Sequence, residues 1–254
     1  MSSLGVDFSS FGGDLAQSTI QQWKDNGVTF AVVQYSNRMP QHLEALKDSG
    51  IQTEAYVYLY WGVDPWGQTP QVRTQNALLM MAGYDVKRLW LDAEDTTHPF
   101  DARQLDACVA LCEGAGVATG IYTGRWVWAG AYGNPTGFEH LPLWHAEYLG
   151  EAPSPDLSKQ PQDFDAFKPY GGWTKPHTWQ FWNTTTFCGH SVDLNAREAD
   201  VTKEEDQLRT LIIRALLRDD YHFVERDPDP ATGERVVEVL SGKDSDSQLL
   251  IRLR

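Results

Sequence analysis

The stretch Arg88-Leu89-Trp90-Leu91-Asp92-Ala93-Glu94 is an apolar segment that ends in two carboxylates. Its run of large apolar side chains is typical of a buried β-strand. Because successive side chains of a strand point to opposite faces, Asp92 and Glu94 would emerge on one side, about 6.6 Å apart along the backbone. Two acids this close do not ionise independently, and the pKa of one of them is pushed upward. The same pattern also fits a strand that merely ends at a solvated loop.

Similar β-type runs recur through the first half of the chain, with helical patterns between them. Strands are expected at 4–9, 28–35, 51–61, 88–94 and 117–123, and helices at 15–26, 41–49, 71–82 and 101–115. Strands that alternate with helices predict a parallel sheet built from βαβ units.

The second half keeps the strand pattern but loses most of the helices. Strands are expected at 141–148, 177–182 and 191–195, joined by loops rich in Pro and Gly. About eight strands with a degenerate second half predict an irregular, TIM-like (β/α)8-type barrel of the α/β class rather than an open doubly wound sheet. The length of 254 residues suits such a barrel.

Composition changes near Asp200, and a separate C-terminal segment follows. Residues 203–218 have the apolar spacing of a helix, residues 221–225 and 235–240 read as a β-hairpin, and 249–253 as a further strand. We therefore expect a barrel domain over 1–200 and a small α+β extension over 201–254. The extension is either an appended module or an element of self-association, and the oligomeric state stays open.

Charge and composition exclude several classes of partner. The formal net charge of −14 is unfavourable for binding nucleic acid or an anionic membrane surface, both of which need basic patches. No Gly-rich phosphate-binding motif follows a strand, and no stretch of 18 apolar residues predicts a membrane-spanning helix. The cysteines Cys108, Cys112 and Cys188 lack the spacing of a disulfide framework or a metal site. We expect neither a metal nor an organic cofactor.

Acidic residues recur at predicted strand ends, which line the active face of a parallel barrel. Asp7 ends the first strand, Asp92 and Glu94 the fourth, and Asp193 lies in the last, so we expect these acids to converge. Such a cluster is costly unless one member holds a proton or binds a cation, and it suits an acid-catalysed glycosidase. Side chains expected to contact a sugar substrate near the same strand ends are Tyr56, Tyr58, Trp61, Tyr122, Trp144, Glu147, Tyr148 and Trp179.

The order of these motifs resembles glycoside hydrolase family 25, the Chalaropsis-type lysozymes. The resemblance covers residues 4 to about 196 and rests on Gly5-Val6-Asp7-Phe8-Ser9, Gly27-Val28-Thr29-Phe30-Ala31-Val32-Val33, Leu89-Trp90-Leu91-Asp92-Ala93-Glu94, Gly120-Ile121-Tyr122-Thr123, Leu143-Trp144-His145-Ala146-Glu147-Tyr148, Trp179-Gln180 and Val192-Asp193-Leu194-Asn195. One departure is Tyr56-Val57-Tyr58, where the family commonly carries Tyr-His followed by Phe or Tyr.

The resemblance implies an irregular β/α barrel that cleaves the β-1,4 bond between N-acetylmuramic acid and N-acetylglucosamine in peptidoglycan. Glu94 would then be the general acid. Asp92 would be a nucleophile, or would orient the substrate acetamido group, and Asp7 and Asp193 would complete the acidic cluster. Two alternatives stay open: a barrel that binds glycan without cutting it, and a barrel glycosidase that acts on another polysaccharide such as chitin.

The start of the chain enters a strand pattern at once, without the basic segment and apolar core of a signal peptide. Together with the resemblance, this predicts a protein made in the cytoplasm that acts on the cell wall after phage-type release, or one that acts outside the cell. The expected partner is the glycan strand of peptidoglycan.

Overall fold

The fold is described from a computed structural model of the chain, which describes residues 2–150, 154–198, 221–226, 235–241 and 248–253. The chain divides into two compact units, Met1–Ala199 and Asp200–Arg254. Within the described ranges, none of the helices is both long and apolar enough to cross a membrane.

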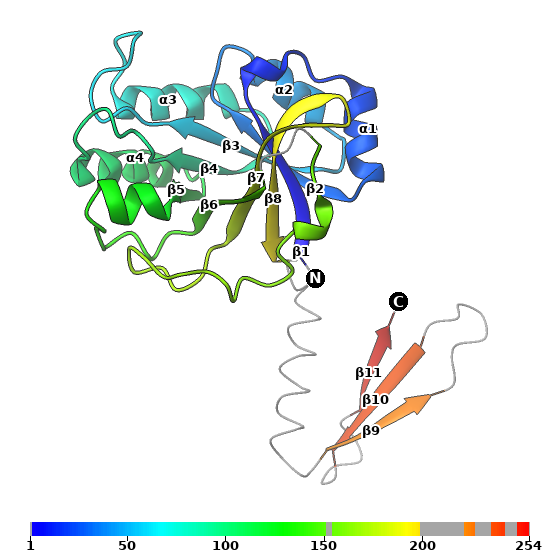
Figure 1. Cartoon of the computed structure of the whole chain (residues 1–254). Coiled ribbons are helices and arrows are strands. Elements are labelled where there is room, and N and C mark those ends of the chain that lie inside the picture. The colour runs from blue at the N-terminus through cyan, green and yellow to red at the C-terminus, as the bar shows by residue number, and fades with distance from the viewer. Residues whose placement is uncertain (1, 151–153, 199–220, 227–234, 242–247, 254) are drawn as a thin grey trace. The chain divides into compact units, whose positions relative to one another are not determined.

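The first unit is a closed barrel whose strands are neighbours in chain order (Figure 1). Its strands are β1 (Ser2–Phe8), β2 (Val28–Gln34), β3 (Gln52–Tyr58), β4 (Val86–Asp92), β5 (Thr119–Gly124), β6 (Leu143–Gly150), β7 (Thr178–Phe187) and β8 (His190–Glu198). The predicted irregular barrel is thereby confirmed.

One strand does not follow the predicted parallel arrangement. Each of the strands β1 to β6 pairs in parallel with the strand that follows it, but β8 is antiparallel to both β7 and β1. Only Cys188 and Gly189 separate β7 from β8, and both have positive φ, 52° and 80°, as a tight hairpin turn requires. A parallel return would need a crossover of about a dozen residues. The reversal of β8 follows from this short turn.

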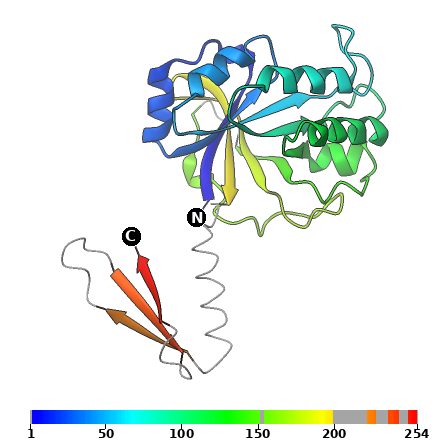
Figure 2. The same cartoon turned by 180° about the vertical axis from the view of Figure 1, so that it is seen from behind.

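Helices cover the outside of the first half of the barrel, as Figure 2 shows from behind. They are α1 (Gln17–Asp25), α2 (Met39–Leu46), α3 (Pro70–Met81) and α4 (Ala102–Gly114). In the described residues between β5 and β8, the helical segments are short: a π-helical turn, η2 (Trp126–Ala131), and a 3-10 turn, η3 (Leu157–Lys159). This confirms the predicted loss of helices in the second half. Another 3-10 turn, η1 (Ser10–Gly12), follows β1.

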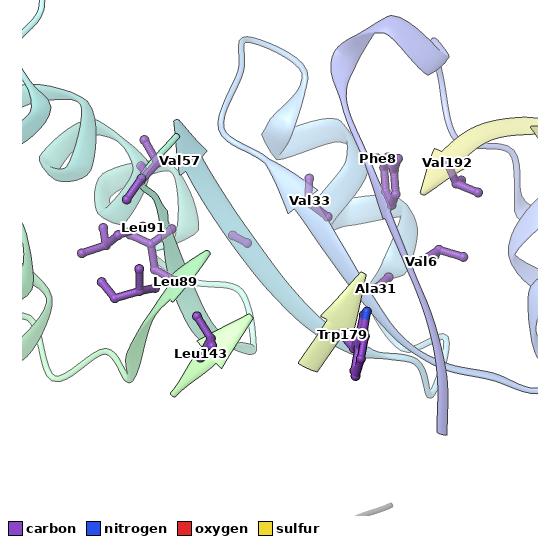
Figure 3. Close-up of a cluster of buried hydrophobic side chains, with 14 of the residues drawn as sticks. Val6, Phe8, Ala31, Val33, Val57, Leu89, Leu91, Leu143, Trp179 and Val192 are labelled. Carbon is purple, nitrogen blue, oxygen red and sulfur yellow. The ribbon is translucent and has the colours of Figure 1, made fainter. Parts of the chain in front are cut away.

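The alternation of side chains along each strand separates two apolar clusters. Residues on the outer face pack in the larger cluster, among them Val6 and Phe8 of β1 and Leu89 and Leu91 of β4 (Figure 3). The inner face carries a second cluster, made of Phe30, Val32, Trp90, Tyr122, Trp144 and Ala146. Since Asp7 alternates with Val6 and Phe8, and Asp92 with Leu91, both acids belong to the inner face.

The end of the barrel where the parallel strands begin is closed by a buried ion pair. Arg197 Nη2 lies 2.7 Å from Glu54 Oε2, and the Trp90 indole donates to the same oxygen at 2.7 Å. The Arg197 guanidinium also lies 3.9 Å from the centroid of the Phe30 ring. The barrel interior is thus filled with paired side chains at this end.

The second unit contains a three-stranded antiparallel sheet in the order β11-β10-β9. Its strands are β9 (Tyr221–Arg226), β10 (Arg235–Ser241) and β11 (Gln248–Leu253). These are the hairpin and the additional strand that the sequence predicts. The helix predicted over 203–218 and the turn over 227–233 lie outside the described residues.

Candidate active site

The four acids expected to converge lie together at the open end of the barrel. Asp7 and Asp193 are directly paired across β1 and β8. The negative charges of Glu94 and Asp7 both act on Asp92 and raise its pKa. Because β8 is antiparallel, Asp193 reaches this end from near the start of its strand rather than from a carboxyl end. The site is therefore built from three strands and the residues that follow β4.

Asp7 is the most enclosed member of the group. Its side chain is buried, and its Oδ2 accepts hydrogen bonds from Asn195 Nδ2 at 2.7 Å and from Gln180 Nε2 at 2.8 Å. Burial, and then the charge of Asp193, raise the pKa of Asp7 well above its usual value, although both hydrogen bonds act in the other direction. Asp7 thus belongs to a polar network that is closed off from solvent.

Asp193 shares one donor with Asp7. Gln180 Nε2 also lies 3.1 Å from Asp193 Oδ2, and the backbone N–H of Thr184 donates to Asp193 Oδ1 at 2.6 Å. Burial raises the pKa of Asp193 to about 6, against the effect of the Thr184 hydrogen bond. Asp193 therefore changes its charge at mildly acidic pH.

Glu94 lies two residues beyond Asp92 and has one direct backbone partner. The N–H of Gly124, the last residue of β5, donates to Glu94 Oε1 at 2.9 Å. Burial raises the pKa of Glu94 to about 7, whereas the Gly124 hydrogen bond lowers it. At neutral pH and below, this carboxyl group holds a proton in a large fraction of molecules.

Desolvation is the largest cause of this raised pKa. The repulsion between Glu94 and Asp92 raises the pKa of the pair further. A low-dielectric environment disfavours the charged form of any carboxyl group, and nearby charges add to this only where they face it closely.

Asp92 is buried at the end of β4, and its Oδ1 has no hydrogen-bond partner among the described residues. Burial raises its pKa most, followed by the charges of Glu94 and Asp7, while Arg73 lowers it. A buried carboxyl oxygen without a partner costs free energy, of the order of 1–3 kcal/mol. Such an oxygen is available to a donor group on a ligand.

Tyrosines surround the acids. The Tyr122 hydroxyl donates to Gln180 Oε1 at 2.8 Å and so extends the polar network of Asp7. Tyr56 and Tyr58 on β3 and Tyr148 on β6 lie near enough to the acids for the carboxylate charges to raise their pKa values. Tyr58 and Tyr148 are also partly exposed, so their rings can contact a ligand above the acids.

Comparison with known proteins agrees with this geometry. A family model described as lysozyme-like protein 1 matches residues 3–181. The chain is 30% identical over 160 residues to the probable GH family 25 lysozyme 5 of Dictyostelium discoideum, and the match covers 60% of this chain and 69% of that protein.

The chain belongs to glycoside hydrolase family 25.

Further relatives of the family differ in length and in distance. The probable GH family 25 lysozyme 3 of Dictyostelium discoideum is 29% identical over 168 residues, which are 63% of this chain but 33% of that protein. The chain thus spans about a third of one curated relative and about two thirds of the other. A solved family GH25 lysozyme from Aspergillus fumigatus is 18% identical with a TM-score of 0.58, covering 83% of this chain and 99% of that one. This last likeness establishes the shared fold.

Three tryptophans expected to stack on sugar in this family 25 chain are instead core residues. Trp61 is buried, with its indole donating to the Tyr132 hydroxyl at 2.8 Å. Trp144 lies inside the barrel and donates to Asn195 Oδ1 at 2.7 Å. Trp179 faces outward and donates to the backbone oxygen of Glu147 at 2.9 Å. The prediction that these three rings contact a sugar is wrong. A position along or just after a strand indicates which face of the sheet a ring occupies, but not whether other side chains cover that face.

Three further aromatic rings at this end are more exposed than those of Tyr58 and Tyr148. Phe11, Trp66 and Trp126 are 94%, 72% and 64% exposed, and they follow β1, β3 and β5, whose carboxyl ends surround the acids. Sequence reasoning did not single them out, although Trp66 and Trp126 occur in short loops directly after predicted strands. Glu147 is the other expected contact, and its side chain is half exposed beside His145.

Gln180 and Asn195 are polar members of the site that the sequence argument did not include. Asn195 lies two residues after Asp193 on β8, so the period of two could have found it. The backbone N–H of Gly124 leaves no signal in the sequence. Among the described residues no group of three or more His, Cys, Asp and Glu side chains is arranged to hold a metal ion.

Proposed function

We propose that this chain is an endo-N-acetylmuramidase that hydrolyses the β-1,4 bond between N-acetylmuramic acid and N-acetylglucosamine in bacterial peptidoglycan. The observation that carries the proposal is Glu94, a carboxyl group beside the buried Asp92 whose pKa is raised to about 7. Membership of family 25 supports the same reaction.

In this mechanism Glu94 is the general acid. It enters the reaction protonated and gives its proton to the glycosidic oxygen as the bond breaks, which avoids a strongly basic leaving group. The Gly124 N–H then stabilises the carboxylate that forms. In the second half of the reaction this carboxylate takes a proton from water and returns to its starting state.

Asp92 assists at the anomeric carbon through the substrate acetamido group. Its unpartnered Oδ1 is an acceptor suited to the acetamido N–H. This unpartnered acceptor favours orientation of the acetamido group over direct attack by Asp92.

Asp7 and Asp193 form the base of the site with Gln180 and Asn195, and hold the polar network beneath the reacting sugar. The partly exposed rings of Tyr58 and Tyr148 and the exposed Trp66 and Trp126 provide apolar surfaces for sugar faces. The protein has a formal net charge of −14, so its affinity for an anionic wall has to come from such contacts rather than from long-range attraction.

The test is the clearing of a suspension of purified peptidoglycan, followed by mass analysis of the released reducing ends. The wild type is expected to clear the suspension and to leave N-acetylmuramic acid at the new reducing ends. Glu94→Gln should abolish clearing with an unchanged fold, while Glu113→Gln, which removes an exposed glutamate of α4, should clear normally.

Three outcomes would contradict the proposal. Clearing by Glu94→Gln at the wild-type rate would show that Glu94 is not the acid. Binding of the wild type to peptidoglycan without release of reducing ends would indicate a glycan-binding barrel. Release from chitin but not from peptidoglycan would indicate a different polysaccharide substrate. With peptidoglycan as the substrate, the place of action is the bacterial cell wall.

A further inference from the structure

A single peptide group beside Glu94 is hydrogen-bonded on both of its sides. Its N–H belongs to Gly124 and donates to Glu94 Oε1 at 2.9 Å. Its carbonyl belongs to Thr123 and accepts from the hydroxyl of Tyr170 at 3.2 Å. The Tyr170 side chain is buried, in the segment between η3 and β7. Tyr170 thus binds the carbonyl side of the same peptide group whose N–H side binds Glu94.

The hydrogen bonds continue from Tyr170 to the surface. Its hydroxyl lies 3.0 Å from His145 Nδ1, and His145 Nε2 lies 3.2 Å from Glu147 Oε2. The His145 side chain is 1% exposed, whereas that of Glu147 is 50% exposed. A connected path therefore runs from a solvent-facing carboxylate through a buried imidazole and a buried phenol to the Thr123–Gly124 peptide.

Three hydrogen bonds make up this path, but the number of hydrogen atoms available to form them depends on the protonation state of His145. A neutral imidazole and a hydroxyl supply two protons, so one contact is left without a hydrogen. With Glu147 ionised, neutral His145 places its proton on Nε2, and the Tyr170 hydroxyl then donates to Nδ1 instead of Thr123. A protonated His145 donates from both nitrogens, which frees the Tyr170 hydroxyl to donate to the Thr123 carbonyl.

The direction of the Tyr170 hydroxyl affects Glu94 through the peptide. A hydrogen bond to a carbonyl polarises the amide and makes its N–H a stronger donor. A stronger Gly124 N–H stabilises the ionised form of Glu94. We propose that Tyr170 is a positioning residue that adjusts the acidity of Glu94 through the Thr123–Gly124 peptide, under the control of the tautomer and protonation state of His145. This rests on the proposed role of Glu94 as the general acid.

The surroundings set the pH range of this control. Burial lowers the pKa of His145, as does Arg125, while Glu147 raises it, so His145 becomes protonated below the usual histidine range. Aromatic rings of Phe167, Tyr170 and Trp179 pack on the imidazole. The titratable groups on other elements that face Glu94 are Asp92 on β4, Tyr58 on β3, Tyr122 on β5, Tyr148 on β6 and Tyr170 itself.

The test is a carbon-13 NMR titration of the Glu94 carboxyl group, assigned by comparison with Glu94→Gln, together with the nitrogen-15 shifts of His145. His145 is neutral in the pH range where Glu94 titrates, so Tyr170→Phe alone, which keeps the ring and removes the donor, should change the Glu94 titration little. Glu147→Gln can donate to Nε2, so His145 should change to the Nδ1–H form, the Tyr170 hydroxyl should donate to Thr123, and the proton affinity of Glu94 should fall about threefold. In the double variant this fall should largely disappear.

Tyr132→Phe is the matched control, because it removes another tyrosine hydroxyl, here partly buried, that donates to a backbone carbonyl, that of Asp95, at 2.9 Å. It should leave the Glu94 titration unchanged. The proposal is overturned if Glu147→Gln leaves the Glu94 titration as in the wild type, or if Glu147→Gln acts equally with and without the Tyr170 hydroxyl. Should Tyr170→Phe not fold, the His145 tautomer and Glu94 titration in Glu147→Gln still decide it. No turnover is needed, so a failed muramidase assay of the wild type is a separate result.

Discussion

Asp7 and Asp193 lie directly opposite each other on the antiparallel strands β1 and β8, and one amide nitrogen of Gln180 contacts both, at 2.8 and 3.1 Å. Two carboxylates facing across a strand pair repel each other. The Gln180 amide can donate one hydrogen to each of them, and its oxygen accepts from Tyr122. Gln180 therefore connects the acids at the base of the site to the tyrosines around it.

Replacement of Gln180 by Leu should destabilise the protein by about 1–3 kcal/mol, since buried polar groups of Asp7, Asp193 and Tyr122 lose a partner. Urea unfolding measures this loss. The matched control is Gln21→Leu, which removes an exposed Gln21–Asp25 hydrogen bond on α1 and should cost far less. Equal losses in the two variants would contradict the shared-donor role of Gln180.

The rate of hydrolysis should fall as pH rises through about 7. Glu94 has to be protonated to act as the acid, and its pKa is about 7. The measurement is kcat/KM against pH on a soluble glycan fragment, with a check that the enzyme stays folded. Activity that keeps rising to pH 9 would assign the proton donor to another group.

The free energy of unfolding should decrease as pH rises, whereas a salt-bridged acid would make it increase. The pKa of Glu94 is raised from 4.5 to about 7, so the folded state binds the proton more tightly than the unfolded state. This contribution is fully present below about pH 4 and is lost as pH rises through about 7, and amounts to at most about 3 kcal/mol. Asp193, with a pKa near 6, acts in the same sense.

Glu94→Gln should accordingly flatten the fall in unfolding free energy between pH 5 and pH 8. Glu113→Gln should retain the wild-type slope. Guanidinium unfolding at several pH values compares the three proteins. A slope unaffected by Glu94→Gln would mean that Glu94 is not desolvated in the folded protein.

Asp92→Ala should lower kcat by about 10²–10³-fold, the loss typical of removing one group that stabilises a transition state. Because Asp92 is assigned to the acetamido group, a thiazoline analogue of the cyclised intermediate should inhibit the wild type competitively. Intact-protein mass spectrometry with an activated 2-fluoro glycoside should detect no adduct. A stable adduct on Asp92 would establish direct nucleophilic attack.

A shortened chain of residues 1–199 should fold and retain activity on soluble glycan fragments. The barrel closes within this range, through the pairing of β1 with β8. Circular dichroism, size-exclusion chromatography and the soluble assay compare it with the full chain, and a change of elution would report self-association through residues 200–254. An insoluble or inactive product would mean that the segment predicted as a helix over 203–218 completes the barrel core.

Much of the fold was predictable because periodicity is a local property. Alternating side chains located β1 to β8, and the 3.6-residue pattern located α1 to α4. The parallel direction assumed for β8 was wrong, since the two-residue Cys188–Gly189 turn leaves no length for a crossover. That turn was readable in principle from the Gly after Cys188 and the short spacing between the strands.

The candidate site was predictable where an acid alternated with apolar neighbours, as Asp7 and Asp92 do. Which side chains are buried was harder to predict from the sequence. Trp144, Trp179 and Tyr148 were all expected to contact a sugar, but of these three only Tyr148 has an exposed ring, because the packing of distant segments decides which rings are covered.

The sequence by itself determined the barrel, the order of its strands and the pairing of Asp92 with Glu94 at the end of one of them, because these depend on residue spacing along a single strand or helix. Only the tertiary structure decided that Asp193 arrives on a reversed strand, that Glu94 is desolvated enough for burial to raise its pKa, and that Tyr170 contacts the peptide that holds it. These depend on desolvation and on contacts between residues far apart in the chain, which no local pattern records.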